Sequence, residues 1–130
     1  MLKKYLVPLS LLLLFFALLL FGWGTFQLLS SGAQSLLTPA GRIQGFLEKE
    51  DWNQANLIYR EIENKWHKFR VYWPMLIHHQ EIDRIEESMS KLKSYLRNEK
   101  LSDAEAELNN LIHYIKHIPE KERFNLQNIL

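Results

Sequence analysis

The chain begins with two lysines followed by a long uncharged stretch. Lys3 and Lys4 precede 25 uncharged residues, Tyr5 to Leu29, which are mostly Leu and Phe. Because about 20 apolar residues cross a bilayer core as a helix, we expect residues 1–29 to form an N-terminal membrane anchor. The next charge is Arg42, so the positive-inside rule predicts a cytoplasmic N-terminus and an extracytoplasmic C-terminal domain.

A cleaved signal peptide is the alternative interpretation of this stretch. Residues 31–33 are small and would suit cleavage before Gln34. The apolar region of a signal peptide runs for about 7–15 residues, whereas here it extends from Leu6 beyond Phe21. This length favours an uncleaved anchor, with Trp23 at the membrane interface.

The composition after the anchor excludes several classes of protein. Residues 42–130 carry 14 Lys and Arg against 15 Asp and Glu, without a basic block, so the clustered positive charge that nucleic-acid binding needs is missing. The chain has no Cys, which excludes disulfides and Cys-ligated zinc.

The residues after the anchor divide into a linker and a helical domain. Residues 30–41 are mainly small or polar, which predicts a juxtamembrane linker. Thr38 followed by Pro39 is typical of a helix start, with Thr38 as N-cap. We expect an extracytoplasmic helical domain over residues 42–130.

Three segments of this domain carry apolar residues at alternating spacings of three and four, which places them on one face of a helix. The sequence therefore predicts an all-α fold, a transmembrane helix followed by a small bundle of antiparallel hairpins. The stripes are Trp52, Ala55, Tyr59, Ile62, Trp66, Phe69 and Trp73; Met75, His78, Ile82, Ile85, Met89, Leu92 and Leu96; and Leu101, Ala104, Leu108, Leu111, Ile115 and Ile118.

Local residue types predict where these helices begin and end. Asp51 can cap the first long helix, and proline in Trp73-Pro74 disfavours helical geometry in the residue before it, so a turn or sharp kink is expected there. Ser102 can open the third long helix with a capping box. Pro119 is expected to end that helix, and a last short helix to follow.

The sequence also contains an internal repeat. Residues 46–55 align with residues 95–104 at an offset of 49. Each copy has an aromatic-Leu pair, a polar turn and an early Ala, a pattern that resembles the helical hairpins of tetratricopeptide-like solenoids. Generic antiparallel hairpins would give the same pattern.

Histidines and carboxylates mark two places where metal chemistry deserves consideration. His79 and Asp83 are one helical turn apart, with Glu81 between them, and can share a metal or form a local hydrogen-bonded pair. We favour the local pair. His113 and His117 have zinc-helix spacing, but the base of the zincin motif is absent and both fall on the outward face, so we expect no metal site.

Aromatic residues are dense before the predicted turn, and most of them fall in the first stripe. Tyr72 lies outside it, so Tyr72 together with Trp73 is a candidate exposed anchor for a partner. The candidate interaction residues are Tyr72, Trp73, His79, Glu81 and Asp83.

Three features of the sequence resemble the domain-of-unknown-function family 4363 of Firmicutes. They are the segment from Trp73 through residues 79–83 (His-Gln-Glu-Ile-Asp), the Ala-rich capped helix after it and the ending Asn128-Ile129-Leu130. The family comprises small single-span proteins with a helical outer domain. The resemblance covers most of the chain after Gly41. It implies a plasma-membrane protein of a Gram-positive-type bacterium, encoded near a multi-span membrane protein. It supplies no catalytic residues.

Nothing in the sequence favours catalysis. A nucleophile elbow, a Gly-rich phosphate loop and a Cys nucleophile are all missing. We therefore expect no catalytic residues, cofactor, metal or small-molecule substrate. The sequence predicts a non-catalytic interaction module for another membrane or envelope protein. The alternative is an envelope sensor or ligand-binding module that uses His79 and Asp83 near the Trp73-Pro74 kink.

Overall fold

The computed structural model of the chain describes residues 2–129, and the side chains of residues 2–121. These residues form four α-helices and a short 3-10 turn, with no strand among them. The elements are α1 (Leu2–Glu48), α2 (Trp52–Tyr72), η1 (Trp73–Met75), α3 (His79–Arg97) and α4 (Leu101–Ile129). The predicted all-α fold is confirmed.

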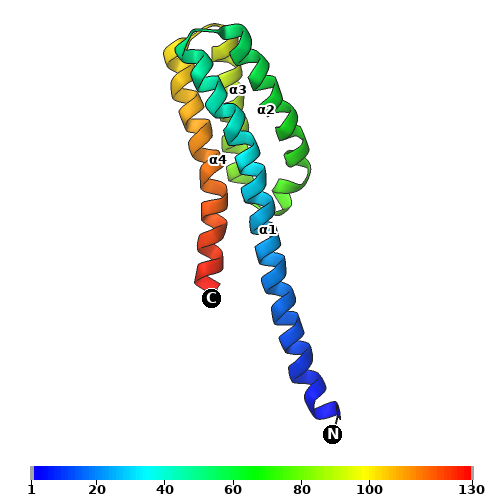
Figure 1. Cartoon of the computed structure of the whole chain (residues 1–130). Coiled ribbons are helices and arrows are strands. Elements are labelled where there is room, and N and C mark those ends of the chain that lie inside the picture. Colours follow the sequence, from blue (N-terminus) through cyan, green and yellow to red (C-terminus); the bar gives the residue numbers. More distant parts are fainter. Residues whose placement is uncertain (1, 130) are drawn as a thin grey trace.

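The helices form an up-down-up-down bundle in which each is antiparallel to the next (Figure 1). The second half of α1 packs against α2 and α4, while α3 packs against α4 and more sparsely against α2. The first half of α1 projects from the bundle, and α4 runs back toward it (Figure 1). Short connections between antiparallel neighbours are the rule in such bundles.

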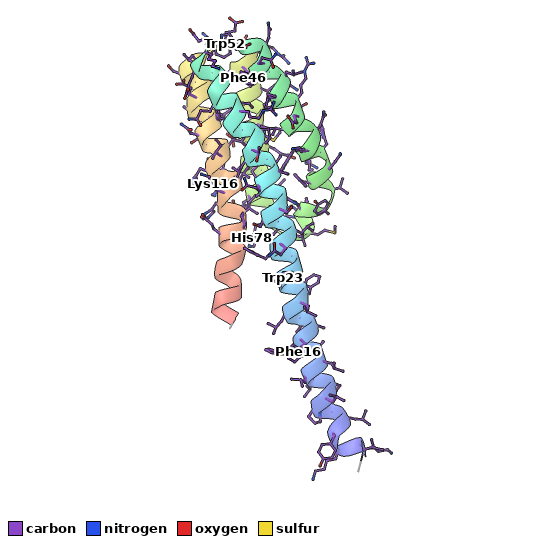
Figure 2. The ribbon with its side chains drawn as sticks, viewed as in Figure 1. Phe16, Trp23, Phe46, Trp52, His78 and Lys116 are labelled. Carbon is purple, nitrogen blue, oxygen red and sulfur yellow. The ribbon has the colours of Figure 1, made fainter. Side chains whose placement is uncertain are left out.

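The projecting half of α1 is apolar and exposed. Most large side chains from Leu2 to Leu28 are exposed, Leu19 and Phe26 are half-buried, and full burial begins at Leu29. Among the described residues, α1 is the helix long and apolar enough to cross a membrane. Figure 2 shows Phe16 and Trp23 on this half, below the bundle.

Residues 30–41 lie within α1, so they do not form the linker that their composition predicted. One face of this segment belongs to the core. The buried residues of α1 are Leu29, Gly32, Ala33, Leu36, Pro39, Ala40, Ile43 and Leu47. Small residues on a helix face let neighbouring helices approach closely. Here that property serves packing rather than flexibility.

Pro39 lies inside α1, and the helix does not begin there as expected. A proline has no N–H, so the carbonyl four residues earlier loses its helical partner. That carbonyl belongs to Ser35, and it accepts a hydrogen bond from Lys65 Nζ of α2 at 3.1 Å. Thr38 donates its hydroxyl to the Gln34 carbonyl and caps nothing. Lys65 thus compensates for the proline.

The three predicted apolar stripes face the core almost throughout. The members from Ala55 to Trp66, from Ile82 to Leu96 and from Ala104 to Ile118 are buried. Met75 and His78 are exposed instead, because they fall in the turn between α2 and α3 rather than on a helix.

Two of the predicted helix boundaries are confirmed. Asp51 caps α2 by accepting a hydrogen bond from the Gln54 N–H at 3.2 Å. The helix ends at Tyr72, and Trp73-Pro74 continues into η1.

The boundaries expected for α4 are wrong. The helix begins at Leu101, so Ser102 lies within its first turn, and it continues through Pro119 to Ile129. The separate last helix expected after Pro119 is therefore part of α4. Proline inside a helix is tolerated when the freed carbonyl finds another partner or the helix bends.

The repeat at an offset of 49 corresponds to two equivalent turns. Glu50 and Glu99 have φ values of 53° and 54°, the left-handed conformation common just after a helix. The N–H of Asp51 bonds to the Phe46 carbonyl at 2.9 Å, and the N–H of Lys100 bonds to the Tyr95 carbonyl at 2.9 Å. The bundle is thus built from two hairpins with the same turn.

An aromatic cluster joins α1 to the end of α2. Trp73 is fully buried; it stacks on Phe69 with ring centroids 5.0 Å apart and meets Trp66 edge-on at 5.6 Å. A Cβ added at Gly32 would lie 2.9 Å from the Trp73 ring. Gly32 therefore leaves the space that the indole fills.

We predict opposite effects on stability from alanine at two glycines of α1. Gly32→Ala should lower the free energy of unfolding by about 1 kcal/mol net, since a clash of about 1–3 kcal/mol outweighs the gain in helix propensity. Gly41→Ala should raise it by about 0.5–1 kcal/mol, because no atom lies within 4 Å of the added Cβ. Denaturant unfolding of the full chain in detergent, followed by circular dichroism, measures both. Stabilisation by Gly32→Ala would contradict the packing of Trp73.

Candidate functional site

The residues predicted to form an interaction site lie around the α2–α3 turn, but they do not form one surface. Tyr72 is half-buried, with its ring edge-on to Phe69 at 6.2 Å. Trp73 is buried in the core, so the expectation that it is an exposed anchor is wrong. The indole fills the space over Gly32 and cannot reach a partner. Its Nε1–H has no hydrogen-bond partner among the described residues.

His79 and Asp83 are both exposed at the start of α3. Within the part of the chain that the structure describes, no hydrogen bond joins them, so the local pair that we favoured is not formed. No three His, Asp or Glu side chains of the described residues lie close enough to hold a metal ion. His78 precedes α3 without capping it through its side chain.

Glu81 ties α3 to α4. Its carboxylate is almost fully buried and accepts a hydrogen bond from Lys121 Nζ at 3.0 Å, while Arg84 Nη1 lies 3.9 Å away. Burial alone would raise the pKa of Glu81, but the bond from Lys121 and the charges of Lys121, Arg84 and His117 outweigh it and lower the pKa. Glu81 is therefore a charged structural contact.

His113 and His117 lie exposed on α4, on the outward face as predicted. Their rings stack with centroids 6.2 Å apart. They form no group with a third ligand among the described residues.

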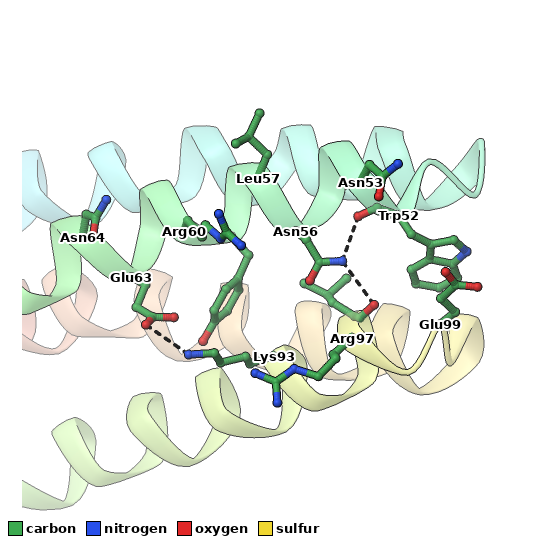
Figure 3. A pocket seen from close by; sticks show the side chains of 12 residues that line it. Trp52, Asn53, Asn56, Leu57, Arg60, Glu63, Asn64, Lys93, Arg97 and Glu99 are labelled. Atoms are coloured by element: carbon green, nitrogen blue, oxygen red, sulfur yellow. Dashed lines mark hydrogen bonds and ion pairs between the residues drawn. The ribbon is translucent and has the colours of Figure 1, made fainter.

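A groove lies between α2 and α3 at the end of the bundle far from the apolar half of α1 (Figures 2 and 3). Its volume is about 750 Å³. The residues that line it are Trp52, Asn53, Asn56, Leu57, Tyr59, Arg60, Glu63, Asn64, Lys93, Leu96, Arg97 and Glu99. At the groove, α2 and α3 are in sparse contact, and polar side chains bridge them.

Two side chains that line the groove, Tyr59 and Asn56, hydrogen-bond across to α3. The buried Tyr59 hydroxyl donates to the Met89 carbonyl at 2.8 Å. The Asn56 amide donates to the carbonyls of Trp52 at 2.8 Å and Leu96 at 3.3 Å (Figure 3). Burial, together with the nearby charge of Glu63, raises the pKa of Tyr59, so the phenol stays neutral and donates.

The walls of the groove carry more cations than the described ion pairs use. Lys93 Nζ lies 3.2 Å from Glu63 Oε1, and Figure 3 shows this pair bridging the two helices. Within the described residues, Arg60 and Arg97 take part in no ion pair. A guanidinium presents several donors in one plane and binds carboxylates in pairs of hydrogen bonds. Against these cations the lining carries the carboxylates of Glu63 and Glu99, so its net charge is +1 and its two guanidiniums offer donors to a carboxylate-bearing segment.

This groove was not predicted from the sequence. Asn53, Asn56, Arg60 and Glu63 recur at spacings of three and four, which places them on one face of α2, beside the apolar stripe. This polar stripe is the sequence feature that could have indicated the groove. Which helix lies opposite depends on the packing of the whole bundle.

The fold and the groove define this protein as a helical bundle built directly onto a long apolar helix. A family model described as Domain of unknown function (DUF4363) matches residues 23–129. The chain belongs to this family, as the residues from Trp73 to Asp83 predicted. The match begins at Trp23, so it includes the part of α1 that packs in the bundle. A search of curated proteins and a search of solved structures each find no match.

We predict that Glu81→Gln lowers the free energy of unfolding by about 1 kcal/mol at pH 7, because the charge-assisted bond to Lys121 is lost. The folded-state pKa of Glu81 lies below its ordinary value, so its contribution is present above about pH 4–5 and is lost as pH falls through the folded pKa. Denaturant unfolding of the full chain in detergent at pH 7 and pH 3 measures this difference. The control is Glu87→Gln, an exposed partner of Lys91, which should leave stability nearly unchanged because surface ion pairs contribute little. Equal losses at both pH values would contradict the role of the charge.

Proposed function

We propose that this protein is a single-span protein of the plasma membrane of a Gram-positive-type bacterium, with a cytoplasmic N-terminus and an extracytoplasmic bundle. The length and exposure of the apolar half of α1 support a membrane span. Lys3 and Lys4, at its start, support the orientation.

The packing of α1 favours an anchor that is retained. Cleavage before Gln34 would remove Leu29, Gly32 and Ala33, which are buried in the bundle. It would also expose the face of Trp73 that packs over Gly32. A signal peptide that is discarded has no reason to contribute to the core of the mature domain.

Topology can be tested directly. We expect alkaline phosphatase fused after Leu130 to be active, because the enzyme folds only outside the cytoplasm, and we expect the same fusion to a truncated chain lacking residues 1–29 to be inactive. Mass spectrometry of the membrane-extracted protein should find an intact N-terminal region. An inactive full-length fusion would overturn the orientation, and a mature chain beginning at Gln34 would overturn the retained anchor.

The bundle serves, in this proposal, as a non-catalytic interaction module for another membrane or envelope protein. The observation that carries it is the groove between α2 and α3, where Arg60 and Arg97 are available to ligand carboxylates. Trp52 at one end and Leu57, which is 54% exposed, add apolar contact area of the kind found at interface hot spots. We infer that the partner offers an acidic segment.

The sensor alternative has less support. It requires His79 and Asp83 to act together, and both side chains are exposed without a hydrogen bond between them in the described structure. The groove between α2 and α3, in contrast, has a defined volume and two guanidiniums in its lining.

Photo-crosslinking tests the groove as the docking site. A photoreactive amino acid at Asn64, on the groove wall, should crosslink in native membranes to an acidic segment of one partner, identified by peptide mass spectrometry. Arg60→Glu with Arg97→Glu should reduce this crosslink at least tenfold, because opposite charge becomes like charge. Lys91→Glu with Lys116→Glu, at exposed positions outside the groove, makes the same change in net charge and should leave the crosslink unchanged. Equal effects of the two double variants would contradict specific docking.

A further inference from the structure

The α2–α3 turn carries exposed apolar side chains that the bundle does not use. Among the described residues beyond Leu28, the large hydrophobic side chains that are exposed are Leu57, Val71 and Met75. Val71 and Met75 are both 77% exposed and flank the turn. Two of three such residues therefore lie within five positions of each other. Isolated exposed apolar residues are common, but these two side chains lie on one short turn at one end of the bundle and together give it a local apolar surface.

The same turn lies against the apolar half of α1. Leu76 lines one surface hollow together with Phe21, Gly24, Thr25 and Leu28. Figure 2 places His78, which follows the turn, close to the level of Trp23. The turn is therefore at the end of the bundle from which the apolar helix projects (Figure 1).

The length of α1 sets the depth of this turn. A helix rises 1.5 Å per residue, so the 20 residues from Tyr5 to Gly24 cover about 30 Å, the thickness of a bilayer's hydrocarbon core. Gly24 then marks the outer boundary of the core, within one or two residues for a tilted helix. Because Leu76 lies beside Gly24 and Leu28, the turn is at the level of the outer membrane–water interface.

We propose that the turn from Val71 to Ile77 is a second membrane contact, which inserts into the interface of the same bilayer that α1 spans. This inference rests on the proposed anchor. Leu76 of the turn lies beside the apolar half of α1, Val71 and Met75 are exposed on the same turn, and the residues around it have interfacial chemistry. Trp23, next to Gly24 in α1, is 62% exposed, and tryptophan is enriched at membrane interfaces. Lys68, one helical turn further from the bilayer, is exposed and can reach lipid headgroups.

The absence of cysteine from the chain makes a direct depth measurement possible. Met75→Cys, Leu57→Cys and Leu14→Cys variants of the full chain, each labelled with the fluorophore NBD, are reconstituted in phosphatidylcholine–phosphatidylglycerol vesicles at low protein density. Quenching by doxyl-labelled lipid reports contact with the bilayer, and quenching by iodide reports exposure to water. Circular dichroism confirms the helical fold of each variant, and Val71→Cys provides a second probe of the turn.

We expect the probe at Met75 to be quenched by doxyl lipid and to be shielded from iodide at least threefold relative to the probe at Leu57, an exposed residue on the groove. Iodide access at Met75 equal to that at Leu57 would overturn the inference. Shielding without lipid quenching would also overturn it, because a second copy of the chain or another protein would then cover the turn. The probe at Leu14 separates the two proposals: lipid quenching at Leu14 but not at Met75 refutes the turn contact alone, whereas its absence at Leu14 refutes the anchor.

Discussion

The continuity of α1 is the constraint on which the rest of the structure depends. The same helix is exposed and apolar up to Leu28 and buried in the bundle from Leu29 to Leu47. The close approach of Gly32 to Trp73 and the bond from Lys65 to the Ser35 carbonyl attach the other helices to it. No flexible joint separates the apolar helix from the bundle. If α1 spans a membrane, the orientation of the bundle relative to that membrane is fixed.

Much of the fold could be predicted from the sequence because helical periodicity is a local property. The stripes through Tyr59, Ile85 and Leu111 correctly identified the buried faces of α2, α3 and α4. The prediction of a linker over residues 30–41 was wrong for a physical reason. Small residues are common both in linkers and where helices touch, and composition alone does not separate the two. Pro39 and Pro119 were likewise predicted to mark helix boundaries but lie inside helices. A freed carbonyl can find a distant partner, as Ser35 finds Lys65.

The candidate site could be predicted less well, because it depends on which helices become neighbours. Trp73 was predicted both to belong to the first apolar stripe and to be part of an exposed anchor at the kink. Its burial agrees with the stripe and not with the anchor, and its position opposite Gly32 depends on how α1 packs against α2. Glu81 was included among interaction residues because of its place in the sequence, yet Lys121, 40 positions away, holds it as a structural contact. The groove combines one face of α2 with the end of α3, which no single segment reveals.

The fixed geometry also limits what kind of partner can reach the groove. At 1.5 Å per residue, the end of α1 at Glu48 lies about 36 Å beyond Gly24, the inferred outer boundary of the hydrocarbon core. The α2 residues that line the groove run from Trp52 to Asn64, so they lie roughly 15–35 Å from that boundary. A partner's transmembrane helix would stay below this height, whereas its extracytoplasmic loop or domain would reach it. A second membrane contact at the α2–α3 turn would restrict tilting of the bundle, because two points rather than one would then hold it. The groove would be presented at a constant height, which favours binding to a partner embedded in the same membrane by removing part of the orientational cost of association.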